Sequence, residues 1–91
     1  MNAYAAAVNT RLARLGRTRA WLAEKIGVSR PTVTNHLKAE AISVDFLRRA
    51  AKALGVGRKA LDALAEQEYQ LALAEGRKMT PPLVNGPHKP Q

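Results

Sequence analysis

Apolar side chains near the start of the chain recur at helical spacing. They stand at intervals of four, four and three residues, at Tyr4, Val8, Leu12 and Leu15, which places them on one face of a helix. The side chain of Asn2 can cap the first turn of this helix, and Gly16 can end it in a left-handed conformation. The pattern predicts a helix between Asn2 and Gly16.

Four further helices are predicted from the same kinds of signal, over residues 19–26, 30–38, 44–54 and 58–75. Three of them follow a residue that caps helices well, namely Thr18, Ser29 and Ser43. Pro31 falls in the first turn of its helix, where no intrahelical hydrogen bond is lost. The strongest apolar stripe lies on the fourth helix, at Phe46, Leu47, Ala50, Ala51 and Leu54.

The last part of the chain has a different composition. Four prolines and two glycines fall in the sixteen residues from Gly76 onward, which predicts a flexible, extended tail over residues 76–91. We therefore expect an all-α fold, with a compact five-helix domain over residues 1–75 and an extended C-terminal tail.

The chain is strongly basic, and its charge is unevenly distributed. The 91 residues carry 15 Lys and Arg against 7 Asp and Glu, a formal net charge of +8. Twelve of the basic and three of the acidic residues fall in residues 1–60, whereas residues 61–75 hold four acids and no base. A positive field of this kind is typical of nucleic-acid-binding proteins, and here it belongs to the first two-thirds of the chain.

Catalytic and metal-dependent functions find little support among the residues. The chain has no cysteine, which excludes disulfides, thiolate catalysis and cysteine-based zinc sites. His36 and His88 are isolated from other metal ligands, and neither Ser29 nor Ser43 has a His base and a carboxylate nearby. We expect a non-enzymatic protein with no catalytic residue, metal, cofactor or evident small-molecule ligand.

Membrane insertion and secretion are not indicated. The longest apolar run, from Ala3 to Val8, is far shorter than the roughly 18 residues that span a bilayer. No basic region precedes that run, as one would in a signal peptide. We therefore expect a soluble cytoplasmic protein with no membrane partner.

Residues 19–38 have the pattern of two helices joined by a tight turn. A small side chain at Ala23 lets two helices approach closely, and Gly27 supplies the positive φ that a tight turn needs. Val28 and Val33 can fill the angle between the helices. This spacing predicts a helix-turn-helix over residues 19–38.

Two segments resemble the lambda-repressor-like helix-turn-helix family, the Cro and repressor or XRE type. They are residues 18–33, TRAWLAEKIGVSRPTV, and residues 46–56, FLRRAAKALGV. The resemblance covers residues 4–64 and implies a compact five-helix DNA-binding domain. It also implies a phage Cro-like or immunity-repressor-like protein that acts at the bacterial nucleoid or in a phage-infected host.

The chain departs from the family pattern in three places. Arg19 stands where the family usually has a glutamine that binds a phosphate. His36 occupies a position that is normally apolar. The loop over residues 39–42 lacks the glycine that commonly follows the recognition helix.

Helical geometry indicates which side chains of the helix over residues 30–38 could meet DNA. At about 100° per residue, a helix that turns Val33, His36 and Leu37 inward presents four residues outward: Pro31, Thr34, Asn35 and Lys38. Arg30 lies to the side, and the resemblance implies that its end of the helix enters the major groove deepest.

Three residues are predicted to read bases: Arg30, Pro31 and Asn35. Arg can bind guanine and Asn can bind adenine through two hydrogen bonds, and Pro31 can contact a thymine methyl group. The alternatives are a phosphate contact without base preference for Arg30 and a solvated position for Asn35. Five more residues are suited to the DNA backbone: Arg19, Ser29, Thr32, Thr34 and Lys38.

These residues predict a sequence-specific regulator of transcription that binds double-stranded DNA, most simply a repressor that occupies an operator through the major groove. One alternative keeps the fold: an antitoxin-like or recombination-control protein whose C-terminal segment binds a partner protein. An alternative of another class is a protein-interaction adaptor that does not bind DNA.

One recognition helix reads too few base pairs to define a unique site, so we expect a homodimer on two half-sites about 10 base pairs apart or a multiple of that. The helix over residues 58–75 extends past Leu64, near which the family domain commonly ends. Its last turns offer Tyr69, Leu71 and Leu73 as dimer contacts. The alternative is that this end folds back onto the first helix of its own chain.

Overall fold

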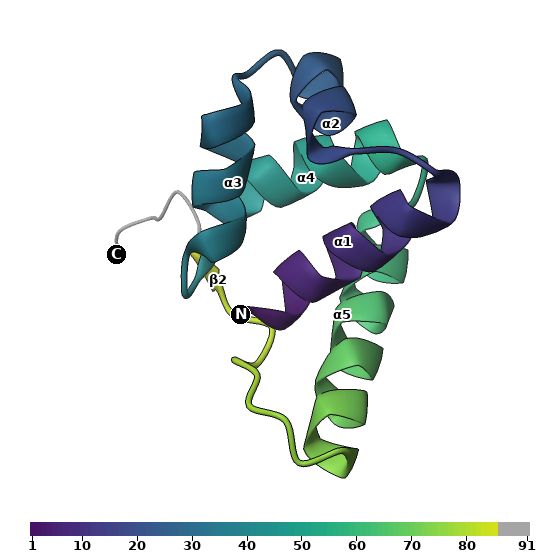
Figure 1. Cartoon of the computed structure of the whole chain (residues 1–91), viewed down its shortest axis with the longest axis vertical. Helices are drawn as coiled ribbons and strands as arrows, with labels where there is room; N and C mark the ends of the chain where they lie inside the picture. The colour runs from purple at the N-terminus through teal and green to yellow at the C-terminus, as the bar shows by residue number, and fades with distance from the viewer. Residues whose placement is uncertain (86–91) are drawn as a thin grey trace.

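The structure, a computed structural model, describes residues 1–85 as five helices and one pair of very short strands. In chain order these are α1 (Ala3–Leu15), α2 (Arg19–Ile26), α3 (Arg30–Lys38), β1 (Ile42–Ser43), α4 (Val44–Leu54), α5 (Arg58–Ala74) and β2 (Val84–Asn85). Figure 1 shows α2, α3 and α4 grouped at one end, while α1 lies across α5 and α5 extends away from the group. The prediction of an all-α, five-helix fold is confirmed. Within residues 1–85, no helix is long and apolar enough to cross a membrane.

Apart from the end of α5, the helices begin and end at the residues that the sequence predicts. Side-chain oxygens of four residues accept a hydrogen bond from a backbone N–H in the first turn of the helix that follows: Asn2, Thr18, Ser29 and Ser43. These bonds satisfy donors that have no partner inside a helix. α5 begins after Gly57 without a side-chain cap, and it ends one residue before the predicted Glu75.

α1 packs along α5 through small side chains. The buried residues of α1 include four alanines, Ala3, Ala5, Ala6 and Ala7. Those of α5 are Leu61, Ala65 and Ala72. In addition, the Thr10 hydroxyl donates a hydrogen bond to Glu68 at 2.7 Å. Helix five therefore folds back onto the first helix of its own chain, which was one of the two alternatives for it.

A cluster of three polar side chains joins the starts of α1 and α5. The Tyr4 hydroxyl donates to Asp62 Oδ1 at 2.6 Å, and Arg58 Nε donates to the same oxygen at 2.9 Å. Burial alone would raise the pKa of the Asp62 carboxyl, but the hydrogen bonds from Tyr4 and Arg58 outweigh burial and lower this pKa. Burial, and then the hydrogen bond to Asp62, raises the pKa of the Tyr4 phenol.

Residues 77–85, which we call the strap, return from the far end of α5 to the start of the chain (Figure 1). The Ala3 N–H donates to the Thr80 carbonyl and the Thr80 N–H donates to the Met1 carbonyl, each at 3.0 Å. Further along, β2 pairs with β1 in parallel, with Val84 opposite Ile42. The composition predicts the extended course of the strap but gives no indication that it is hydrogen-bonded to the body. The rest of the predicted tail, residues 86–91, lies outside the described residues.

Candidate nucleic-acid interface

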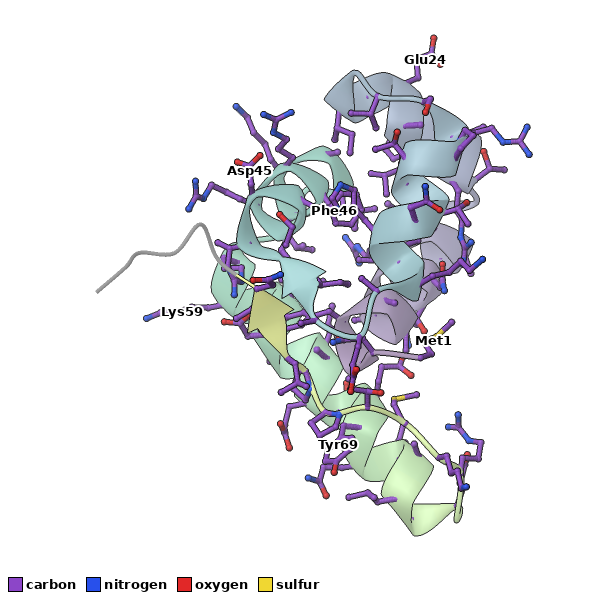
Figure 2. The ribbon with its side chains drawn as sticks, turned by 90° about the vertical axis from the view of Figure 1, so that its left-hand side faces the viewer. Met1, Glu24, Asp45, Phe46, Lys59 and Tyr69 are labelled. Atoms are coloured by element: carbon purple, nitrogen blue, oxygen red, sulfur yellow. The ribbon has the colours of Figure 1, made fainter. Side chains whose placement is uncertain are left out.

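The recognition helix α3 is fixed from behind by the core. Val33 and Leu37 are 0% and 2% exposed, and the His36 ring stacks on Phe46 with 4.5 Å between centroids and 13° between planes. Figure 2 shows Phe46 reaching from α4 toward α3. His36 is thus turned inward, as predicted, and its flat ring fills the normally apolar position by stacking. The opposite side of α3 is left to solvent.

That outer side brings the three predicted base-reading residues together. Arg30, Pro31 and Asn35 are exposed, and together with Thr34 they line a shallow hollow on α3. Within residues 1–85, no ion pair or side-chain hydrogen bond involves Arg30, Asn35 or Lys38. Their donors and acceptors are therefore available to a partner molecule.

Apart from Thr34, the predicted backbone-contacting residues lie at the start of α2 and at the two ends of α3. Arg19, at the start of α2, is half-buried, and its Nε donates to Asn9 Oδ1 at 3.3 Å. At the start of α3, the hydroxyls of Ser29 and Thr32 lie 2.8 Å apart and share a hydrogen bond. Lys38 is exposed at the other end of the helix. The structure adds Asn9, which the sequence did not single out and which orients the Arg19 guanidinium.

The loop after α3 needs no glycine. Ala39 leaves the helix with φ −66° and ψ 145°, an extended conformation that any residue adopts. Within residues 1–85, positive φ values occur only at glycines, including Gly27 in the turn between α2 and α3, with φ 77°. This departure from the family pattern therefore carries no backbone strain.

The arrangement is thus two short helices joined by a tight glycine turn. One side of the second helix is buried, and its opposite side is polar and exposed. A family model described as helix-turn-helix matches residues 9–61, which is more than half of the chain. The chain belongs to the helix-turn-helix family. Members are DNA-binding regulators, and so this chain is a DNA-binding regulator whose partner is double-stranded DNA. Comparisons with curated proteins and with solved structures gave no match.

This helix-turn-helix protein has a second basic surface that sequence reasoning missed. Lys25, Arg49 and Lys52 line a shallow hollow between α2 and α4, and this hollow shares no residue with the one on α3. The spacing of Arg49 and Lys52 on one side of α4 was the available signal. Arg49 forms an ion pair with Asp45 at 3.2 Å, and both side chains are exposed, so the pair contributes little to stability.

Trp21 of the helix-turn-helix packs against the core and does not join the reading face. The ring is half-buried. The Arg17 guanidinium lies 5.2 Å and the Lys25 ammonium 5.8 Å from its centroid. Such cation–π contacts hold both positive charges close to the Trp21 ring.

The three predicted dimer contacts on α5 do not share one face. Tyr69 is half-buried against the core, while Leu71 and Leu73 are each 51% exposed. Residues two apart on a helix point about 200° apart, so Leu71 and Leu73 face different sides. Leu71 borders a hollow of about 180 Å³ between α1 and α5, lined also by Ala7, Thr10, Arg11, Arg14, Leu64, Gln67 and Glu68.

Proposed function

We propose that this helix-turn-helix protein is a sequence-specific repressor that lays α3 in the major groove of an operator and thereby excludes polymerase or another regulator. The proposal rests on the side chains that the outer face of α3 exposes. There Arg30, Pro31 and Asn35 are exposed side by side. Because the back of the helix is packed against α4 through His36 and Phe46, the face is rigid enough to read a defined pattern.

The chemistry of the three side chains matches the edges of base pairs. Arg30 can donate two parallel hydrogen bonds to guanine O6 and N7, and Asn35 can bind adenine N6 and N7. Arg30 and Asn35 are five residues apart and therefore about 7.5 Å apart along the helix axis, which is close to two base-pair steps of about 3.4 Å. The two residues therefore suit positions two base pairs apart in one half-site.

Contacts to phosphates would fix the position of the helix in the groove. We assign them to Arg19, Ser29, Thr32, Thr34 and Lys38. The hydroxyls of Ser29 and Thr32 lie at the N-terminus of α3, where the helix dipole also favours an anion. Arg19 and Lys38 supply charge at the start of α2 and the end of α3, so the contacts would flank the base-reading residues on both sides.

We also propose that two copies bind one operator and meet at the hollow between α1 and α5 beside Leu71. Basic residues of α1 and acidic Glu68 of α5 surround an apolar floor there. Such a patch can meet a second copy of itself across a two-fold axis. The alternative contact is the side of α5 that carries Tyr69 and Leu73.

The function is tested by selecting bound duplexes from a random DNA pool and placing the selected sequence over a promoter that drives a reporter. We expect one enriched sequence with two-fold symmetry and a reporter that falls silent when the protein is made. Binding without enrichment would contradict sequence-specific reading. No binding at low salt would leave the adaptor function instead.

The dimer is tested by sedimentation on the selected duplex. Leu71→Asp should reduce the complex from two protomers per duplex to one, because it places a charge in the apolar contact. Gln70→Asp adds the same charge at an exposed neighbouring position and should leave two protomers. Loss of pairing in Leu73→Asp alone would move the contact to the Tyr69 side, and a wild-type monomer on the duplex would refute the dimer.

A further inference from the structure

Asn2 is the one buried polar residue among residues 1–85, at 1% exposure. Its side chain joins three segments that lie far apart in the sequence. Asn2 Oδ1 accepts from the Tyr4 N–H at 2.7 Å and so caps α1. Asn2 Nδ2 donates to the Glu40 carbonyl at 2.7 Å and to the Leu83 carbonyl at 3.0 Å. Both ends of the amide are therefore occupied.

The two donated bonds clip the loop that follows the recognition helix to the strap. Glu40 lies two residues after the end of α3. The Leu83 carbonyl also accepts from the Ile42 N–H at 3.0 Å, so the amides of Asn2 and Ile42 converge on one strap oxygen. Beyond it, Val84 pairs with Ile42 and Asn85 with Ser43. The loop at the C-terminal end of α3, which we call the exit of α3, is thus held both by Asn2 and by the strap.

A small movement at this exit would matter for reading DNA. α3 has nine residues and is therefore about 13 Å long. A tilt of about 5° would shift one end of such a helix by about 1 Å, whereas side chains that recognise a ligand must be held within about 0.5 Å. The hydrogen bonds of Asn2 to Glu40 and Leu83 therefore restrain a movement of α3 that is large enough to break contacts with bases.

We propose that Asn2 and the strap are positioning elements for base reading: they fix the exit of α3 and through it the angle at which Arg30 and Asn35 meet the bases. This inference rests on the proposed function. The helix-turn-helix match covers residues 9–61, so Asn2 and the strap lie outside it.

The two roles of Asn2 can be separated by substitution. Asn2→Ser keeps a side-chain oxygen that caps α1 well, but its short hydroxyl cannot replace both bonds that the amide donates. The matched control is Tyr4→Phe, which removes the hydrogen bond from the Tyr4 hydroxyl to Asp62 between α1 and α5. This bond also holds α1 in place but does not touch α3, its loop or the strap.

The measurement is the affinity for the duplex selected by the wild-type protein divided by the affinity for a random-sequence duplex. It is made at a temperature at which circular dichroism shows each variant to be fully folded. Asn2→Ser should lower this ratio about five- to tenfold, a size typical of coupling between sites. Tyr4→Phe should leave it unchanged. In hydrogen exchange, the Ile42 amide should exchange faster in Asn2→Ser, whereas the Leu61 amide should not.

A wild-type ratio near one would overturn the proposed function and the positioning role with it. A wild-type protein that discriminates, with an equal ratio in Asn2→Ser, would overturn the positioning role alone. Equal losses in Asn2→Ser and Tyr4→Phe would also overturn it, since they would reflect general loosening. A second variant tests the strap itself. Thr80→Pro removes the N–H that bonds the strap to Met1, and it should lower the affinity ratio as Asn2→Ser does.

Discussion

The α1–α5 pair and the outer face of α3 use their polar side chains in opposite ways. α1 and α5 have 13 and 17 residues and join their polar groups to one another, as in the bonds of Tyr4 to Asp62 and Thr10 to Glu68. α2 and α3 have only 8 and 9 residues, lengths at which an isolated helix is marginal. The outward side chains of α3 make no such bonds within residues 1–85.

The comparison teaches that the side chains that stabilise the fold differ from those that we propose to recognise DNA. Short helices hold their shape through caps and through buried apolar residues such as Leu22 and Val33. Their exposed polar groups contribute little to folding and are available to DNA. Substitutions should therefore divide into those that change the free energy of unfolding and those that change DNA affinity.

The largest expected effect comes from removing a buried side chain that supports the recognition unit. Leu22 is 0% exposed, so Leu22→Ala should lower the free energy of unfolding by about 2–5 kcal/mol, measured by urea denaturation. Leu15→Ala makes the same chemical change at a position that is 40% exposed. This control should cost less than about 1 kcal/mol, and equal costs would contradict the assignment of the core.

The next effect should appear in binding alone. Arg30→Ala and Asn35→Ala should each weaken binding to the selected duplex by about 1–3 kcal/mol, since each removes a paired contact to one base. Unfolding should change by less than about 0.5 kcal/mol. Arg48→Ala removes an equal charge from an exposed position on α4 and serves as the control. Equal losses on selected and random DNA would reassign Arg30 and Asn35 to backbone contacts.

The same division explains what the sequence could predict. Caps at Thr18, Ser29 and Ser43 act within one turn of helix, so the residues that begin each helix are visible locally. The outward face of α3 follows from helical periodicity once Val33 is placed inside. These signals predict the helix boundaries and the outward position of Pro31 and Asn35, whereas the choice of Arg30 also rests on the resemblance to the helix-turn-helix family.

What the sequence did not predict depends on contacts between distant residues. The local role of Asn2 as a cap is visible, but its bonds to Glu40 and Leu83 span 38 and 81 residues. On α5, the sequence offers Leu71 and Leu73 as contacts, and both are half-exposed, but it does not reveal that Ala65 and Ala72 form part of the buried side. The close approach of the alanine-rich α1 favours small side chains there, and helical periodicity alone does not reveal a partner of that shape.

A smaller effect should appear as pH dependence in the α1–α5 pair. Because the pKa of Asp62 is lowered from 3.8 by folding, its contribution to stability is present above pH 3.8 and is lost as pH falls through the lower folded value. The Asp62 and Arg58 side chains are 45% and 35% exposed, so screening limits this contribution to about 1 kcal/mol. Urea denaturation from pH 6 down to pH 2 should show a shallower loss in Asp62→Asn than in the wild type. Identical slopes would contradict the role of the carboxylate.

The smallest effect concerns single phosphate contacts. Arg19→Gln and Lys38→Gln should each flatten the slope of log K against log salt by about one unit, because each removes one released counterion. Lys59→Gln, at an exposed position at the start of α5, should leave the slope as it is. A slope unchanged by Arg19→Gln would mean that Arg19 serves only to bond Asn9.

The central claim is that α3 reads bases in the major groove through Arg30, and modified DNA tests it most directly. Each guanine of the selected duplex is replaced in turn by 7-deazaguanine, which keeps base pairing but lacks the N7 acceptor. One replacement per half-site should weaken wild-type binding by roughly 1 kcal/mol, the value of one hydrogen bond, and should not weaken Arg30→Ala further. If no guanine is sensitive, or if the wild type and Arg30→Ala lose equal affinity, Arg30 does not read a base.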